Sequence, residues 1–298
     1  MLNRRTLLSA AIIAGLAPGI VLPATTPRMR RIPASGETIP VIGLGTSQTF
    51  DVGADTAARD ALLPALREFF TQGGTVIDSS PMYGSAEAVT GYLLSRLAPA
   101  ARPFIATKVW TNGNAAGREQ MQASAEHLGV TRVDLMQVHN LQDWRTQLAT
   151  LREWKATGRI RYIGITTSRA AQYREFESVM RNEALDFVQL NYSAGEREAE
   201  ETLLPLARER GMAVMVNRPF MRGALFQQVR GKPLPGWAAD YHCNSWGQLF
   251  LTFALSHPAV TCLIPATSSL RHMTDNMAAG FGREPDAVFR KQLLAELS

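Results

Sequence analysis

Short apolar runs alternate with longer segments of mixed apolar and polar residues along most of the chain. Each run is followed by a stretch in which apolar residues recur with helical spacing. Eight such strand–helix units favour a (β/α)8 TIM barrel, with a doubly wound open sheet as the alternative. The runs are Val41–Gly45, Thr75–Asp78, Phe104–Lys108, Val133–His139, Ile160–Ile165, Phe187–Asn191, Ala213–Asn217 and Thr261–Ile264.

A pair of shorter segments precedes the first run. Met29–Ile32 and Thr38–Val41 flank Pro33–Gly36, a pattern that predicts a β-hairpin. No Gly-x-Gly-x-x-Gly sequence opens a helix after the first run, which argues against the open sheet. The chain from 221 to 240 is expected to form a loop over the mouth of the barrel. Helices are predicted over residues 56–72, 86–97, 117–128, 143–157, 170–181, 197–210, 244–256, 270–279 and 286–296.

The first 24 residues differ in composition from the rest of the chain. Arg4 and Arg5 precede an apolar run, Ala11 to Leu22, that suits a signal peptide and is too short to span a membrane. The placement of the arginine pair resembles a twin-arginine export signal. An ordinary Sec signal or an uncleaved anchor are the alternatives.

We therefore expect residues 1–24 to be a signal peptide, cleaved between about Leu22 and Thr26. Residues 25–298 would then form one barrel domain, exported folded to the periplasm by the twin-arginine machinery. The mature form is expected to have no stable membrane span.

Composition narrows the class of partner. The formal net charge is +5, and loss of Arg4 and Arg5 with residues 1–24 lowers it to +3. No block of basic residues with interleaved aromatic residues indicates nucleic-acid binding. The two cysteines, Cys243 and Cys262, are too few for a disulfide framework, so buried free thiols are expected. No metal site is expected.

Four polar residues mark the ends of three consecutive predicted strands. Asp78, Lys108 and His139 end their runs, and Tyr83 follows in the loop after Asp78. Parallel strands lie about 4.8 Å apart, so side chains at the same end of neighbouring strands converge. Each residue alone has an ordinary explanation as a loop, capping or surface residue. Together, an acid, a phenol, an amine and an imidazole predict a proton-transfer site.

This set resembles the catalytic tetrad of the aldo-keto reductases, and the resemblance covers almost the whole mature chain. The order and spacing of the four residues are its most specific part. The other matching segments are Ile42–Thr46, Asp78–Glu87, Gly158–Ile165, Ile264–Ser269 and Asp275–Asn276. The resemblance implies a reductase that converts an aldehyde or ketone to an alcohol with NAD(P)H.

The implied roles follow the chemistry of each residue. The hydride must come from a reduced nicotinamide, because no side chain supplies one. Tyr83 would donate the proton, and Lys108 would lower the pKa of its phenol from about 10. Asp78 would hold Lys108, and His139 would donate a hydrogen bond to the carbonyl oxygen.

The implied cofactor is NADP, with NAD as an alternative. Asn217 stands where many family members have a stacking aromatic residue, and Ala266 where a lysine often binds phosphate. Thr267 and Ser268 are phosphate candidates or, alternatively, a plain helix N-cap. The implied cofactor-binding residues are Gly45, Thr46, Asp78, Thr166, Thr167, Gln189, Asn217, Phe220, Thr267, Ser268, His272, Asp275 and Asn276, with Arg271 as a further cation.

Trp110 and Trp237 are expected to line the substrate pocket, and the partner is expected to be a small carbonyl compound. A different function remains open from the sequence. The chain could be an NADP-binding sensor or regulatory module with little turnover, since fold alone does not establish catalysis. We expect a monomer in either case.

Overall fold

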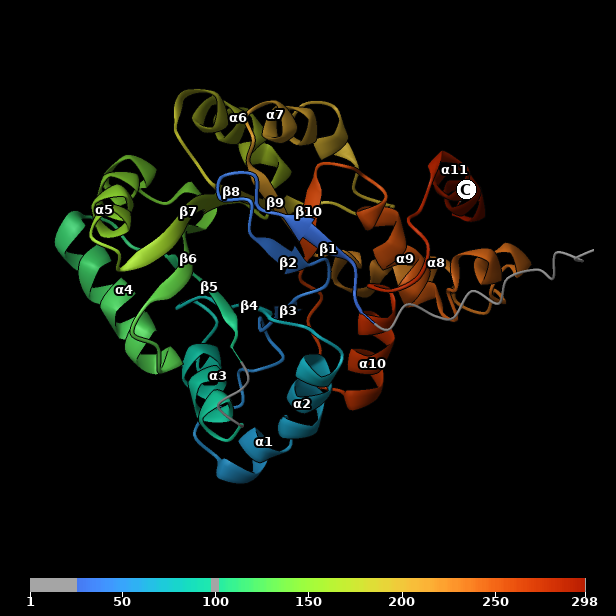
Figure 1. Ribbon diagram of the computed structural model, residues 1–298, viewed down its shortest axis with the longest axis horizontal. Coiled ribbons are helices and arrows are strands. Elements are labelled where there is room, and N and C mark those ends of the chain that lie inside the picture. Colours follow the sequence, from blue (N-terminus) through green and yellow to red (C-terminus); the bar gives the residue numbers. More distant parts are fainter. Residues whose placement is uncertain (1–25, 98–101, 298) are drawn as a thin grey trace, which may run out of the picture.

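The computed structural model describes residues 26–97 and 102–297, and within them eight parallel strands are surrounded by helices (Figure 1). The predicted signal peptide lies outside the described residues. Neighbouring strands follow one another in sequence order from β3 to β10. The strands are β3 (Leu44–Gly45), β4 (Val76–Asp78), β5 (Phe104–Val109), β6 (Val133–Val138), β7 (Ile160–Thr166), β8 (Phe187–Asn191), β9 (Ala213–Asn217) and β10 (Val260–Leu263).

Two parallel bridges close the sheet into a barrel. Ile42 pairs with Leu263, and Gly45 pairs with Ala266. The first and last strand regions therefore meet, which an open sheet does not allow. The prediction of a (β/α)8 barrel is confirmed, and the doubly wound alternative is wrong.

Helices alternate with the strands as the apolar spacing predicts. Several begin at a polar cap: Asp55 accepts a hydrogen bond from the Ala58 N–H, and Ser245 accepts one from Gln248. The helices are α1 (Thr56–Asp60), α2 (Leu63–Thr71), α3 (Ala86–Ser95), α4 (Asn114–Leu128), α5 (Trp144–Ala156), α6 (Tyr173–Asn182), α7 (Leu203–Glu209), α8 (Ala224–Gln228), α9 (Trp246–Leu255), α10 (Leu270–Ala278) and α11 (Ala287–Glu296). Short 3₁₀ segments are η1 (His139–Leu141), η2 (Ala170–Gln172), η3 (Glu198–Glu200), η4 (Met221–Gly223) and η5 (Gly236–Tyr241).

Two predictions of local structure need correction. The single helix expected over 56–72 is divided into α1 and α2, because Pro64 in the first turn of α2 cannot continue a preceding helix. The loop expected over 221–240 contains η4, α8 and most of η5. Its second half lies against α11, since Lys232 Nζ donates to the Glu296 carbonyl at 2.8 Å.

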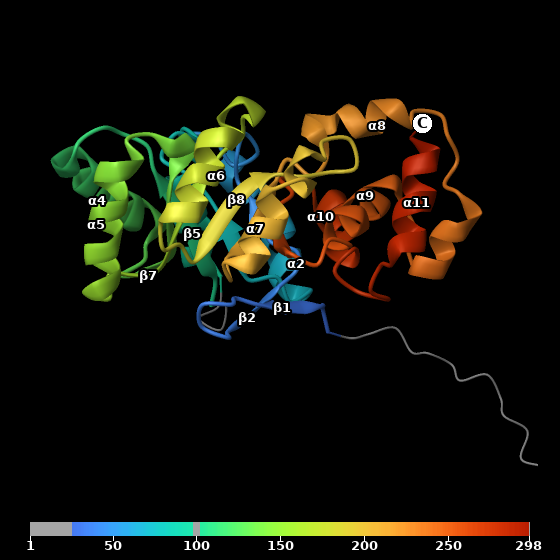
Figure 2. The same ribbon diagram turned by 90° about the horizontal axis from the view of Figure 1, so that it is seen from above.

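The predicted hairpin is present as β1 (Met29–Arg31) paired antiparallel with β2 (Thr38–Pro40). Figure 2 shows it at one end of the barrel, with α8 at the opposite end. Ile32 and Ile39 pack in the same buried cluster as Val76, Phe104 and other residues that the strands direct into the barrel interior. The hairpin thus closes the N-terminal end of the barrel with apolar side chains.

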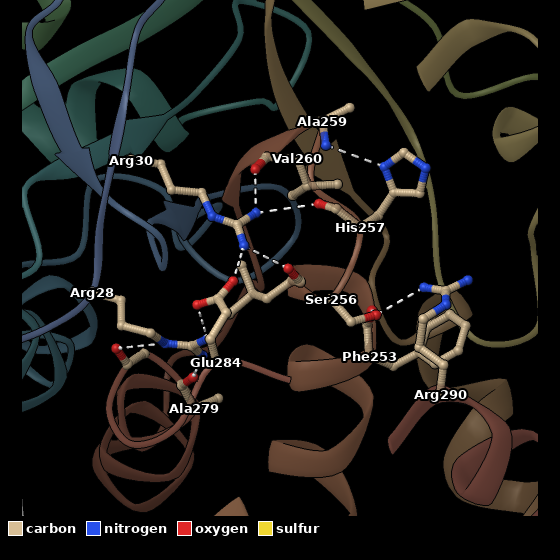
Figure 3. Close-up of polar contacts among 12 residues, drawn as sticks. Arg28, Arg30, Phe253, Ser256, His257, Ala259, Val260, Ala279, Glu284 and Arg290 are labelled. Atoms are coloured by element: carbon tan, nitrogen blue, oxygen red, sulfur yellow. Dashed lines mark hydrogen bonds and ion pairs between the residues drawn. The ribbon is translucent and has the colours of Figure 1, made fainter. Parts of the chain in front are cut away.

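Two arginines fasten the hairpin to the C-terminal part of the chain (Figure 3). Arg28 donates to Glu284 Oε2 at 2.8 Å and to the Ala279 carbonyl at 2.7 Å. Arg30 donates to the Leu255 carbonyl at 2.7 Å and also bonds Glu284. Hydrogen bonds that involve a charged group are the stronger ones, so these contacts fix the position of the hairpin.

Other features of the described residues bear on the sequence predictions. Cys243 and Cys262 are free and buried, as expected. No helix in the described part of the chain is long and apolar enough to cross a membrane. Across the same residues, no cluster of three or more His, Cys, Asp or Glu side chains is placed to hold a metal ion.

Candidate active site

The alternation of side chains along each strand places the polar residues at one end of the barrel interior. On β5, Phe104 and Ala106 belong to the interior apolar cluster, and Lys108 is the next residue on that face. On β4, Asp78 follows Val76 in the same way. Strands β6, β7, β8 and β9 repeat the change from apolar to polar, which they make by Gln137, Thr166, Gln189 and Asn217. The interior is therefore apolar beside the hairpin and polar at the opposite, C-terminal mouth.

Asp78 and Lys108 form a buried ion pair at this mouth. Lys108 Nζ lies 2.6 Å from Asp78 Oδ2 and donates to the Ser79 carbonyl at 2.7 Å, and both side chains are at most 2% exposed. Burial alone would favour the neutral amine. The charge of Asp78, with hydrogen bonds to Asp78 and Tyr83, outweighs that effect and raises the pKa of Lys108. Lys108 is accordingly a fixed cation beside the phenol.

Two glutamine amides hold the other carboxylate oxygen of Asp78. Gln189 Nε2 donates to Asp78 Oδ1 at 2.9 Å, and Gln137 Nε2 donates to the same atom at 3.3 Å. The amide nitrogen of Gln189 is thus already engaged. That nitrogen has a second hydrogen, so Gln189 keeps a donor as well as its oxygen for the nicotinamide carboxamide contact that the sequence implies.

Tyr83 lies in the loop before α3, with its ring centroid 5.1 Å from Lys108 Nζ. Burial raises the pKa of the phenol, and the Lys108 charge opposes this only in part, so the net pKa is above the ordinary value. Lys108 lowers this pKa as the sequence predicts, but burial is the larger effect and sets the direction of the net shift. The phenol keeps its proton at neutral pH.

His139 begins η1, directly after β6, and its side chain is 5% exposed. Its ring meets the edge of the Tyr83 ring with centroids 5.8 Å apart, and Nδ1 lies 3.0 Å from Ser80 Oγ. Burial and the Lys108 charge lower the pKa of His139 to about 2. The imidazole is therefore neutral at physiological pH. It carries a hydrogen on only one of its two ring nitrogens, and the other nitrogen is an acceptor.

These residues border a cavity of about 620 Å³, a size typical of small-molecule sites. Asp78, Tyr83 and His139 line it, whereas Lys108 lies behind them with no exposed surface. The predicted cofactor residues that line this cavity are Gly45, Thr46, Asp78, Thr166, Asn217 and Phe220. The structure therefore brings the four predicted catalytic residues together at one cavity.

A second cavity of about 700 Å³ continues toward the N-terminus of α10. Phe220, Phe226 and Ala266 line both cavities, so the two adjoin, and we refer to them together as the cleft. The predicted cofactor residues Thr267, His272, Asp275 and Asn276 line the second cavity together with Arg271. An elongated cleft with proton-transfer groups at one end and cations at the other suits a dinucleotide.

Two buried polar atoms in the first cavity strengthen this fit. Asn217 Oδ1 and Arg218 Nε are both inaccessible to water and have no hydrogen-bond partner among the described residues. Buried polar groups are normally hydrogen-bonded, so an unpaired acceptor and an unpaired cationic donor on residues of this cavity are consistent with a polar ligand there. An amide and an anionic group would satisfy them.

Some predicted site residues lie elsewhere. Thr167 is buried and its hydroxyl bonds Gln172 Oε1 at 2.7 Å, outside both cavity linings. Ser268 is exposed and lines neither cavity. The N-cap of α10 is Ser269, so the alternative that Thr267 and Ser268 cap this helix is off by one residue.

The two tryptophans predicted for the substrate pocket differ in their placement. Trp110 is 42% exposed, with its ring centroid 6.5 Å from that of His139, so it stands at the mouth. Trp237 packs against Phe289 of α11 at 5.7 Å, and its Nε1 donates to Glu296. The prediction for Trp237 is wrong, because the second half of the 221–240 segment folds onto α11 instead of over the mouth.

Sequence reasoning missed several residues in the cleft or directly behind it. Ser80 contacts His139 from within the Asp78–Glu87 segment, where its position two residues after Asp78 was the available signal. Arg218 and Arg222 add two cations to the first cavity, and both have left-handed backbone with φ of 51° and 53°. Such conformations are uncommon outside glycine and tend to occur at functional sites. Periodicity gives no signal for them.

The barrel fold and the proton-transfer residues at its mouth are those of an oxidoreductase. Comparisons with known proteins lead to the same class. The model of the Aldo/keto reductase family matches residues 41–290. Methylglyoxal reductase YeaE of Escherichia coli (strain K12) is 28% identical over 259 residues, which cover 84% of this chain and 89% of that protein. The NADH-specific methylglyoxal reductase of the same organism is 28% identical over 249 residues, covering 70% and 73%.

A solved structure supports the fold. The aldo/keto reductase from Klebsiella pneumoniae, in complex with NADP and acetate, superposes with a TM-score of 0.73 at 24% identity and covers 87% of this chain and 91% of that one. The chain belongs to the aldo/keto reductase family. It is therefore an NAD(P)H-dependent oxidoreductase, and the alternative of a sensor module receives no support.

Proposed function

We propose that the protein reduces a small aldehyde or ketone to an alcohol, with NADPH preferred over NADH. The observation that carries this proposal is the meeting of Tyr83, His139 and the Asp78–Lys108 pair at one end of a cleft that continues to α10. A bound reduced nicotinamide would supply the hydride. The chain itself supplies the proton and holds the carbonyl.

Each polar residue has a task set by its surroundings. Tyr83 carries a proton at neutral pH and lines the cavity, so it is the donor for the developing alkoxide. The fixed charge of Lys108 stabilises the phenolate left behind, and Asp78 holds that cation in place. His139, neutral and lining the same cavity, donates a hydrogen bond to the carbonyl oxygen.

The preference for NADPH is proposed from the cations of the cleft. Arg271 and His272 line the cavity next to α10, where a 2′-phosphate would find charged or hydrogen-bonding partners. Arg218, with its unpaired Nε, is proposed to hold a phosphate nearer the catalytic residues. Since Ala266 offers no charge, the preference over NADH is proposed to be modest.

The substrate is proposed to be a small aldehyde or ketone, and methylglyoxal is a reasonable first test because two relatives are methylglyoxal reductases. The experiment measures NADPH and NADH oxidation by the purified protein with methylglyoxal and a panel of aliphatic and aromatic aldehydes. Saturable oxidation that depends on the carbonyl compound supports the proposal. Tight dinucleotide binding without oxidation on the whole panel contradicts it.

Export through the twin-arginine route is proposed from Arg4 and Arg5 and the apolar run behind them. The exported protein is proposed to reach the periplasm folded, as a monomer, with its dinucleotide bound. Replacing both arginines by lysine should leave a folded, unprocessed protein in the cytoplasm, whereas unchanged export would indicate the Sec route. Mature periplasmic protein should contain near-stoichiometric dinucleotide and elute as a monomer, and empty protein would contradict co-export.

A further inference from the structure

The two nitrogens of the His139 ring have different surroundings. Nδ1 lies 3.0 Å from Ser80 Oγ, and both residues are buried, Ser80 with no exposed surface. Nε2 has no hydrogen-bond partner among the described residues, although the ring lines the catalytic cavity. Nε2 is therefore the nitrogen available to a ligand.

The hydrogen-bonding capacity of Ser80 decides which nitrogen carries the proton. A serine hydroxyl has one hydrogen to donate and two lone pairs to accept with. Its oxygen already accepts the Met82 backbone N–H at 3.3 Å. In the described part of the chain, the remaining contact of this hydroxyl is His139 Nδ1, so its hydrogen finds an acceptor only if Nδ1 is unprotonated.

We propose that Ser80 is a positioning residue that fixes His139 as the tautomer with hydrogen on Nε2. This inference rests on the proposed function, because it gives His139 a donor directed at the substrate carbonyl oxygen. In the opposite tautomer, the Nε2 lone pair would face the partial negative charge of that oxygen. The interaction would then oppose the charge that develops on the oxygen during reduction.

A purely structural role for Ser80 makes a different prediction. The Met82 contact could simply hold the loop after β4, in which case loss of the hydroxyl would change stability but not the imidazole. The position of the imidazole hydrogen is a property that such a role does not control. It therefore separates the two explanations.

The test uses ¹⁵N-histidine-labelled full-length protein without added dinucleotide. The signals of His139 are identified by their absence in His139→Gln, since the chain contains five histidines. Wild type should show a pyridine-type Nδ1 and a pyrrole-type Nε2. Ser80→Ala should show a mixture of tautomers or their reversal.

Kinetics provide the second readout. Removing an oxyanion donor outright costs about 10²–10³-fold in kcat, so Ser80→Ala is expected to lose about 10- to 100-fold in kcat. The Kd for NADPH should stay unchanged, because the hydroxyl faces His139. Ser80→Thr, which keeps the hydroxyl, should restore both the tautomer and the rate.

Ser79→Ala is the matched control. It removes the neighbouring buried hydroxyl, whose contact is Thr46 Oγ1 at 2.9 Å, and should leave the His139 nitrogen signals unchanged. A wild-type spectrum with hydrogen on Nδ1 overturns the inference even if Ser80→Ala fails to fold. An unchanged tautomer and kcat in folded Ser80→Ala overturns it as well. The expected tautomer in a protein that reduces no carbonyl would instead contradict the proposed function alone.

Discussion

The two ends of the barrel differ in whether their buried polar groups have hydrogen-bond partners within the protein. At the hairpin end, Ile32 and Ile39 complete an apolar cluster, and the guanidinium of Arg30 is surrounded by carbonyls and Glu284 (Figure 3). At the mouth, a buried ion pair sits beside polar atoms of Asn217 and Arg218 that have no partner. The first arrangement serves stability in the protein alone. The second leaves polar groups available to a ligand.

Substitutions at the mouth should therefore affect chemistry, and those at the hairpin end should affect stability. The largest effect is expected from Tyr83→Phe, which removes the proton donor. Carbonyl reduction should fall by about 10²–10⁴-fold, the usual contribution of general acid catalysis, while dinucleotide affinity stays nearly unchanged. Steady-state kinetics and fluorescence titration with NADPH measure the two quantities.

The matched control for this variant is Tyr92→Phe, since the Tyr92 hydroxyl bonds Asp60 on the outside of the barrel. That variant should keep the wild-type kcat. Wild-type turnover in Tyr83→Phe would show that another group donates the proton.

Arg30→Met tests the opposite end. It removes charge-assisted hydrogen bonds to Glu284 and the Leu255 carbonyl, and bonds of this kind contribute about 1.5–3 kcal/mol. The free energy of unfolding in urea should fall by about that amount, with kcat unchanged. Arg31→Met is the control, because the Arg31 side chain is exposed and has no hydrogen bond or ion pair within the described residues. A fall in kcat with unchanged stability would show that the two ends are not separate.

The pH dependence of stability should identify His139 as a buried neutral group. Its pKa is lowered from 6.5 to about 2, so below pH 6.5 the unfolded chain binds a proton that the folded chain does not. The contribution of His139 to the free energy of unfolding is therefore fully present above pH 6.5. It is lost as the pH falls toward 2, by up to about 1.4 kcal/mol per pH unit. Urea unfolding at pH 8 and pH 5 should show a smaller loss in His139→Gln. Equal losses in both proteins would mean that His139 ionises in the folded state.

The smallest effect is expected from Ala266→Lys at the exposed rim of the cleft. A lysine there would place a charge near a 2′-phosphate, and exposed charge pairs contribute up to about 1 kcal/mol, which is about fivefold in affinity. Fluorescence titration should show tighter NADP binding with NAD affinity unchanged. Ala266→Gln, similar in length but uncharged, is the control. Equal gains for both dinucleotides would place the phosphate elsewhere.

The sequence predicts the barrel well because the spacing of apolar residues and the alternation of side chains along a strand are both local patterns. Apolar runs and helical spacing locate strands and helices, and alternation along β4 and β5 places Asp78 and Lys108 on the interior face. The convergence of these residues with His139 follows from strand order alone. These features do not depend on the conformation of the loops.

Predictions were wrong or incomplete where tertiary contacts outweigh local pattern. The position of Trp237 depends on whether its segment turns toward the mouth or toward α11. Its hydrogen bond to Glu296 places it against α11. The net pKa of Tyr83 depends on the balance between burial and one nearby charge, which a sequence does not contain. The left-handed backbone at Arg218 likewise gives no periodic signal.

The contacts that attach the hairpin to the C-terminal part of the chain also bear on the order in which the protein folds as it is synthesised. Arg30 bonds the Leu255 carbonyl, 225 positions later, and Arg28 bonds Glu284, 256 positions later. Contacts this distant in sequence form late, because the loop between them must first be closed. On a ribosome, the arginines nearest the start of the domain have no partners until nearly all of the chain has emerged. The N-terminal segment is therefore expected to dock only after the last strand of the barrel has been synthesised.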